Sequence, residues 1–167
     1  MDRVDLARLV NKVTPSLRLV ALDGLTDASN VGTIVKVAAA FGATAILLSS
    51  DCCDALSPRS IRVSAGHVFH VPLIQGDLVA MLQELNDSGV LTMAAIVQEA
   101  KFLDEVPQLP LRWALVLGSE HHGVRREVRA VCQGRLKAAM SLDFEVYPGG
   151  KRIKNLWKTC EKPNEDL

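Results

Sequence analysis

The strongest constraint on the fold is the alternation of short, wholly apolar runs with stretches of helical periodicity. The run TAILLSS at residues 44–50 does not alternate polar with apolar side chains, which is typical of a strand covered on both faces of a sheet. Four other runs predict strands, at 17–22, 67–74, 90–97 and 112–118. Pro72 confines the third of them to a sheet edge or a strand end. The pattern predicts an α/β fold with a mostly parallel sheet flanked by helices.

The segments between these runs predict helices. DRVDLARLVNKV at 2–13 places apolar residues at helical spacing and is stopped by Pro15. Ser57 before Pro58 can cap another helix. Further helices are expected at 31–42, 77–87 and 126–134. We therefore expect a single domain over 1–167, which includes an N-terminal helix at 2–13 and a C-terminal segment at 140–167 that diverges from the preceding pattern.

Composition restricts the classes of protein to which this chain can belong. Of 167 residues, 49% are hydrophobic and 23% charged, as in an ordinary globular domain. Lys plus Arg and Asp plus Glu are both 19, and this zero net charge still permits a local basic face for nucleic acid. No stretch approaches the roughly 20 apolar residues that span a bilayer, and the N-terminus lacks the apolar segment of a signal peptide, so we expect a cytoplasmic protein. The four cysteines, Cys52, Cys53, Cys132 and Cys160, form no CxxC pair, which predicts reduced thiols rather than a zinc site.

The stretch LVLGSEHHG at 115–123 is the best candidate for a ligand loop. Ligands of such folds bind beyond the carboxyl ends of the strands, and here an aliphatic strand runs into Gly118, a carboxylate, two histidines and Gly123. The Glu-His-His run suggests a metal, but sequential residues on a tight turn rarely converge on one ion. We expect no metal. Glycines let the backbone approach a ligand closely, so a backbone cradle is the better interpretation.

Two other polar loops follow expected strands. LDGLTDASNVG at 22–32 carries four polar side chains before a helix: Asp23, Asp27, Ser29 and Asn30. Capping of that helix is the ordinary explanation for each one, but it does not account for all four together with two glycines. SIRVSAGHVFHV at 60–71 places Arg62 and Ser64 at an expected helix end beside Gly66. Arg62 is either a solvated surface residue or a phosphate partner.

Three stretches resemble, in order and spacing, the SpoU (TrmH-like) RNA ribose methyltransferases of the SPOUT superfamily. They are LDGLTDASNVGTIVKVAAAFGATAILL, RSIRVSAGHVFHVPL and ALVLGSEHHGV, and the resemblance covers residues 19–134. It implies an α/β domain with a C-terminal trefoil knot that binds S-adenosylmethionine. It also implies a homodimer that transfers a methyl group to a ribose 2′-hydroxyl of tRNA or rRNA.

The resemblance also implies roles for individual residues. The catalytic candidates are Asn30, Lys36, Glu120 and Ser141. Lys36 stands where the family usually has an arginine, and it lacks the planar fork of that residue. The cofactor-binding candidates are Leu117, Gly118, Ser119, Glu120, Gly123, Ala139 and Met140. Candidates for contact with RNA are Arg59, Arg62, Ser64, Arg125 and Arg126. His121 and His122 receive no role.

The third family motif is altered in this sequence. The chain reads KAAMSLDFEVYPGGKRIKNLWK, so that Met140 and Ser141 match the motif while Asp143 replaces an asparagine. Pro148-Gly149-Gly150 interrupts the helix that should follow. In the family this region closes the knot, covers the adenine and contributes to dimer packing. Three interpretations stay open: a divergent active enzyme, a catalytically degenerate RNA-binding or dimerisation module, and a frameshift or alternative end near residue 140.

Overall fold

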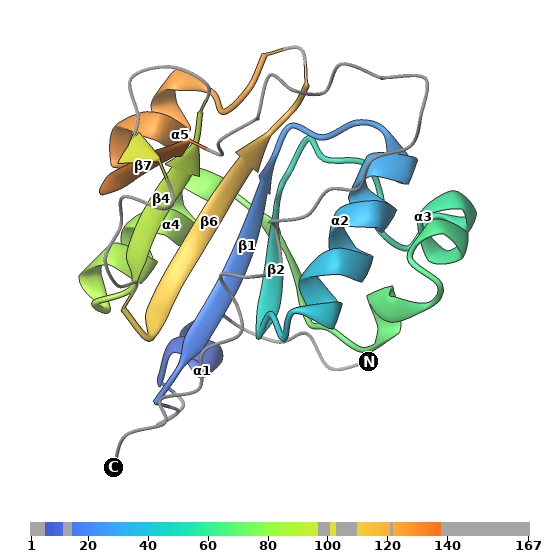
Figure 1. The fold of residues 1–167 in the computed structure, drawn as a ribbon, viewed down its shortest axis with the longest axis horizontal. Coiled ribbons are helices and arrows are strands. Elements are labelled where there is room, and N and C mark those ends of the chain that lie inside the picture. The colour runs from blue at the N-terminus through green and yellow to red at the C-terminus, as the bar shows by residue number, and fades with distance from the viewer. Residues whose placement is uncertain (1–5, 12–14, 97–100, 103–109, 121, 138–167) are drawn as a thin grey trace, which may run out of the picture.

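A parallel sheet forms the centre of the molecule (Figure 1). The computed structural model describes residues 6–11, 15–96, 101–102, 110–120 and 122–137. Within these residues seven strands pair in the order β3-β2-β1-β6-β4-β7-β5, and each pair is parallel. The strands are β1 Leu17–Asp23, β2 Ala45–Ser49, β3 Leu73–Gly76, β4 Leu91–Ala95, β5 Lys101–Phe102, β6 Arg112–Gly118 and β7 Gly134–Lys137. The predicted α/β fold with a mostly parallel sheet is confirmed.

Helices cover both faces of this sheet (Figure 1). They are α1 Leu6–Asn11, α2 Ala28–Ala40, α3 Pro58–Val63, α4 Leu78–Asp87, α5 Arg126–Val131 and the short 3₁₀ helix η1 His67–Phe69. Apolar residues of α1, α4 and α5 share one core cluster with the sheet, and those of α2 and η1 share the other. Among the described residues, no helix has the length and apolarity that crossing a membrane requires.

Strand β2 shows why its sequence lacks polar alternation. All five of its residues are buried. Leu47 packs into the cluster of α1, α4 and α5, while its neighbours Ile46 and Leu48 pack into the cluster of α2 and η1. Both faces of the strand therefore need apolar side chains.

Two predicted elements differ from those observed. The strand expected at 67–74 begins only at Leu73, because Gly66 adopts a φ of +80° and opens the helical turn η1. As the proline predicted, β3 is an edge strand. The helix expected at 126–134 ends at Val131, and the unpredicted strand β7 follows it. Ser57 caps α3 as predicted, with its hydroxyl accepting a hydrogen bond from the Ser60 backbone.

The carboxyl ends of the central strands lie together at one end of the molecule. Asp23 at the end of β1 pairs in register with Gly118 at the end of β6. Helix α1 lies near the opposite end of these strands, where the Arg112 guanidinium donates a hydrogen bond to the Val10 carbonyl (Figure 1). The predicted knot and the segment 140–167 lie outside the described residues, as do Ala139, Met140 and Ser141.

Candidate active site

The loop after β6 folds back tightly on its own strand. A Cβ atom added to Gly118 would lie 2.0 Å from the carbonyl carbon of Gly123 and 2.2 Å from the Val124 nitrogen. The Gly123 N–H donates a hydrogen bond to the Ser119 carbonyl at 2.7 Å, and Gly123 has a φ of +64°. Only glycine at position 118 permits this approach of two backbone segments. The loop therefore has the tight backbone geometry of a cradle.

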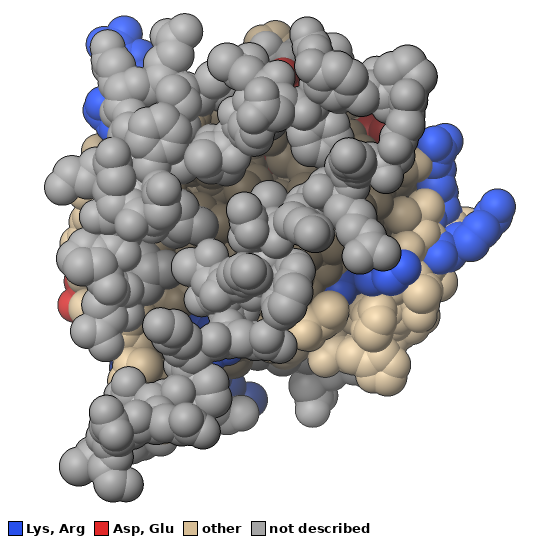
Figure 2. Space-filling model, in the orientation of Figure 1, with Lys and Arg blue, Asp and Glu red and all other residues tan. Residues whose placement is uncertain are grey.

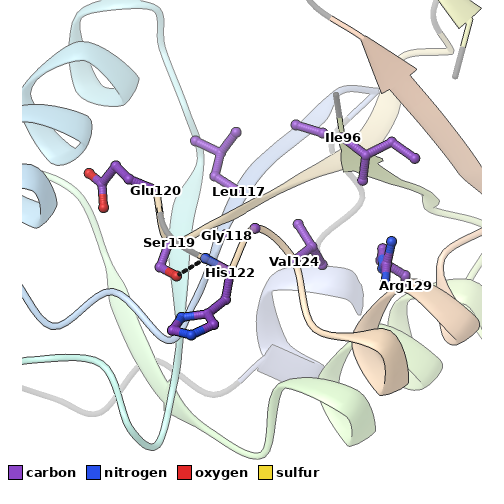
Figure 3. Close-up of a pocket in the computed structure, with 10 residues that line it drawn as sticks. Ile96, Leu117, Gly118, Ser119, Glu120, His122, Val124 and Arg129 are labelled. Carbon is purple, nitrogen blue, oxygen red and sulfur yellow. Dashed lines mark hydrogen bonds between the residues drawn. The ribbon is translucent and has the colours of Figure 1, made fainter. Parts of the chain in front are cut away.

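A cavity of about 500 Å³ opens beside this loop (Figure 3). Its lining comes from β4, β6, α5 and the loop: Ala95, Ile96, Leu117, Gly118, Ser119, Glu120, His122, Gly123, Val124 and Arg129. Figure 3 shows Glu120 on the side away from Ile96 and Arg129. The volume lies within the range of small-molecule sites, and the mixture of apolar side chains with a few polar groups is typical of them. We call it the cradle cavity.

A second cavity of about 490 Å³ lies between the same loop and the start of α2. Its lining residues are Gly24, Thr26, Asp27, Asn30, Ser119, Glu120 and His122. Ser119, Glu120 and His122 border both cavities. The loop thus borders both cavities, so a ligand in either cavity would contact it. We call this space the acceptor cavity.

Asn30 and Glu120 meet in the acceptor cavity although 90 positions separate them in the chain. The Asn30 amide donates a hydrogen bond to a carboxylate oxygen of Glu120. Asp27 caps α2 by accepting a hydrogen bond from the Ser29 backbone at 2.7 Å. Because Asp27 performs the capping, the side chain of Asn30 in the first turn is left to reach across to the loop.

Comparisons with known proteins agree with this arrangement. Residues 17–147 match the SpoU rRNA Methylase family. The chain belongs to the SpoU family. It is 33% identical over 139 residues to a protein from Nitrosomonas europaea named "23S rRNA (guanosine-2'-O-)-methyltransferase RlmB", covering 82% of this chain and 53% of that protein. The chain thus spans about half the length of this curated relative, and the same holds for others that it matches.

Solved structures of related proteins share the fold. A putative RNA methyltransferase of the TrmH family from Porphyromonas gingivalis is 28% identical, with a TM-score of 0.70, over 86% of this chain and 55% of that chain. A second structure, described as "Structural insights into the 2-OH methylation of C/U34 on tRNA", is 26% identical with a TM-score of 0.64. The match covers 87% of this chain and 90% of that one.

Two arginines of this SpoU chain lie exposed on α3, as predicted for residues that contact RNA. The Arg59 guanidinium donates a hydrogen bond to the Ser29 hydroxyl at 2.5 Å, which holds it beside the start of α2. Arg62 is exposed on the same helix, and Arg126 is exposed at the start of α5. Their contact with RNA stays a prediction.

Two other residues predicted to contact RNA make contacts within the chain, and their contact with RNA stays a prediction. Ser64 is 0% exposed, and its hydroxyl donates a hydrogen bond to the Ile61 carbonyl at 3.0 Å. Arg125 pairs with the buried carboxylate of Asp23 at 2.5 Å. The hydrogen bond to Asp23 raises the pKa of Arg125, and the side chain stays 40% exposed. A phosphate would have to compete with a carboxylate that is already in place.

Lys36 is exposed on α2, away from the apolar stripe, as its helical spacing predicted. It is not among the described residues that line either cavity, in contrast to Asn30 and Glu120. Its predicted catalytic role therefore has no support from the geometry of one chain.

Glycine positions and strand ends were enough to find the loop, and Ala95 and Ile96 could have been found from the end of their predicted strand. No sequence pattern indicated that Arg129 lines the cradle cavity or that Arg125 pairs with Asp23.

Proposed function

We propose that this chain transfers a methyl group from S-adenosylmethionine to a ribose 2′-hydroxyl of tRNA or rRNA. The observation that carries the proposal is the Asn30–Glu120 hydrogen bond at the loop that borders both cavities. Methyl transfer requires direct, in-line contact between the methyl carbon of the donor and the oxygen of the acceptor, and the residues shared by the two linings mark where the cavities adjoin. Membership of the SpoU family and the names of the relatives support the same reaction.

The cradle cavity fits the cofactor. The close approach of Gly118 to Gly123 leaves no room for a side chain, so backbone groups form this part of the wall. Leu117 and Ile96 offer apolar surface, and Ser119 offers polar groups. When bound there, S-adenosylmethionine would supply an electrophilic methyl group on a sulfonium centre. Glu120 would place a negative charge near that positive centre.

In the acceptor cavity, Glu120 accepts the hydrogen bond of the ribose 2′-hydroxyl. Its carboxylate thereby orients the attacking oxygen and favours departure of the proton. The Asn30 amide fixes one carboxylate oxygen, which leaves the other for the hydroxyl. The pair thus positions the acceptor oxygen where the acceptor cavity adjoins the cradle cavity.

Helices α2 and α3 form the surface that meets the RNA backbone. Lys36, Arg59 and Arg62 are the charged residues of these two helices, and neither helix contains Asp or Glu. Figure 2 shows Lys and Arg side chains along the side of the molecule where α2 and α3 lie. Phosphate contacts of this kind give affinity and position the strand without reading its sequence. The bond from Arg59 to Ser29 places one cation next to Asn30.

The test measures 2′-O-methylated nucleosides after incubation of the full chain with S-adenosylmethionine and either tRNA or rRNA. We expect Asn30→Ala and Glu120→Gln to lower kcat by about 100-fold, the order of a lost general acid–base or positioning group. The exposed Gln83 on α4 supplies a control, since Gln83→Ala should retain full activity. A wild-type chain that binds the cofactor and both RNAs but methylates neither would overturn the proposal.

A second candidate function is RNA binding without methyl transfer. It is favoured by Lys36, which stands at the position of the expected arginine and lines neither cavity. Calorimetry separates the two functions, because this alternative requires RNA binding without binding of S-adenosylmethionine. A homodimer and a cytoplasmic location stay predictions.

A further inference from the structure

Asp23 is a buried carboxylate that the proposed reaction does not use. It ends β1, and its side chain is 0% exposed. Burying a carboxylate is unfavourable unless charged and hydrogen-bonding partners compensate for the loss of water. The partners of Asp23 therefore indicate what the residue holds in place.

Both oxygens of Asp23 bind one residue, Arg125. One oxygen accepts a hydrogen bond from the Arg125 backbone N–H at 2.7 Å. The other accepts a hydrogen bond from Nε at 2.8 Å and lies 2.5 Å from a terminal guanidinium nitrogen. Because backbone and side chain are held together, Asp23 fixes where the chain runs at position 125 and not merely where a charge lies.

Asp23 also lies at the other end of the same loop. In the sheet, Asp23 of β1 is the register partner of Gly118 of β6. The cradle loop, described at residues 118–120 and 122–125, therefore begins beside Asp23 through strand pairing and is held to Asp23 again through the ion pair. Between these points the backbone makes the close approach of Gly118 to Gly123 that shapes the cradle cavity.

We propose that Asp23 is a positioning residue that sets the shape of the cofactor site by holding both ends of the cradle loop. The inference rests on the proposed function, because it assigns the cradle cavity to S-adenosylmethionine. Asp51 also contacts Arg125, but at 3.3 Å and with a side chain that is 54% exposed. Asp51 contributes little to the loop, since exposed ion pairs are weak.

Asp23→Asn and Asp51→Asn form a matched pair for the test, because each removes one negative charge from the same guanidinium. For Asp23→Asn we expect Kd and KM for S-adenosylmethionine to rise at least 10-fold. We expect kcat to fall as well, because Glu120 lies on the same loop, and the Kd for RNA to stay within about 3-fold of wild type. Asp51→Asn should leave all four quantities within about 3-fold. Arg125→Ala should weaken cofactor binding as Asp23→Asn does, and the double variant should be no weaker than either single variant.

Amide hydrogen exchange on the ligand-free chain supplies the readout that does not depend on the cofactor. Asp23→Asn should speed exchange in peptides that cover 118–126 and leave β2 and α4 protected. Uniformly faster exchange along the sheet, or unchanged cofactor affinity, would overturn the inference. If Asp23→Asn does not fold, the same measurements are made on Arg125→Ala, which removes the other member of the ion pair and changes a side chain that is only partly buried. A wild-type chain that binds no cofactor would overturn the proposed function, and the exchange data would still show whether Asp23 holds the loop.

Discussion

At Gly118 the structure requires the absence of a side chain. Its backbone φ is not in the left-handed region, so conformational freedom is not the reason for glycine. The reason is that Gly123 and Val124 occupy the space of a Cβ. The neighbouring Gly123, with a φ of +64°, meets the opposite requirement, for backbone freedom in open space.

Gly118→Ala should therefore abolish cofactor binding. The added methyl group would overlap two backbone segments that cannot rotate away, which should also lower the free energy of unfolding by about 1–3 kcal/mol. Gly76→Ala is the control, since Gly76 also ends a strand, and a Cβ there meets nothing within 4 Å. Urea unfolding and calorimetry with S-adenosylmethionine measure the two effects. Normal cofactor affinity in Gly118→Ala would contradict the assignment of the cradle.

The residues of the site differ in how clearly the sequence predicts them. Gly118, Gly123 and Glu120 follow an aliphatic strand, and this context alone indicates a ligand loop. Asn30 and Glu120 were named as catalytic candidates by resemblance to a family, but their hydrogen bond was not predicted, because no local pattern reports a contact across 90 positions. Asp23 was grouped with the capping residues, since a buried carboxylate and a capping one look alike until the partner Arg125 is placed.

At the scale of elements, strands covered on both faces were predicted best. Their apolar runs are complete, as in β2, and periodicity is the main sequence signal. Elements that depend on their partners were not predicted. Strand β7, Gly134–Lys137, has only four residues and pairs between β4 and β5, so its strand character comes from its neighbours. For η1, the apolar residues of HVFHV suggested a strand, but the positive φ of Gly66 produced a turn.

Helix α3 gives a prediction about RNA. Arg62→Glu should raise the Kd for RNA several-fold and reduce the salt dependence of binding by about one phosphate contact. The Kd for S-adenosylmethionine should not change, because Arg62 lines neither cavity. Filter binding over a series of salt concentrations measures the slope.

The matched control for this prediction is Arg8→Glu. Arg8 is exposed on α1, which lies near the other end of the central strands (Figure 1). The Arg8→Glu substitution makes the same change in net charge as Arg62→Glu, but at a distance from the site. Equal weakening by both variants would show that RNA responds to total charge, and α3 would then not be the contact surface.

At the scale of the whole molecule, the site joins the two halves of the sheet. The cradle cavity takes residues from β4, β6 and α5, while the acceptor cavity takes residues from the segment after β1 and from α2. The two helical layers lie on opposite faces of one sheet, with a core cluster on each. A ligand in the cradle cavity should therefore raise the free energy of unfolding of the entire described domain.

We expect S-adenosylmethionine at 100 times its Kd to stabilise the native state by about 2.7 kcal/mol, because a ligand that binds only the folded chain shifts unfolding by mass action. For a domain of this size that should raise Tm by roughly 5–11 °C. Differential scanning calorimetry measures the shift, with methionine at the same concentration as the control. Methionine lacks the adenosine that the cavity's apolar lining would cover, so it should shift Tm by less than about 1 °C. Equal shifts with both compounds would place the ligand contacts outside the cradle cavity, since Leu117 and Ile96 would then contribute nothing to recognition.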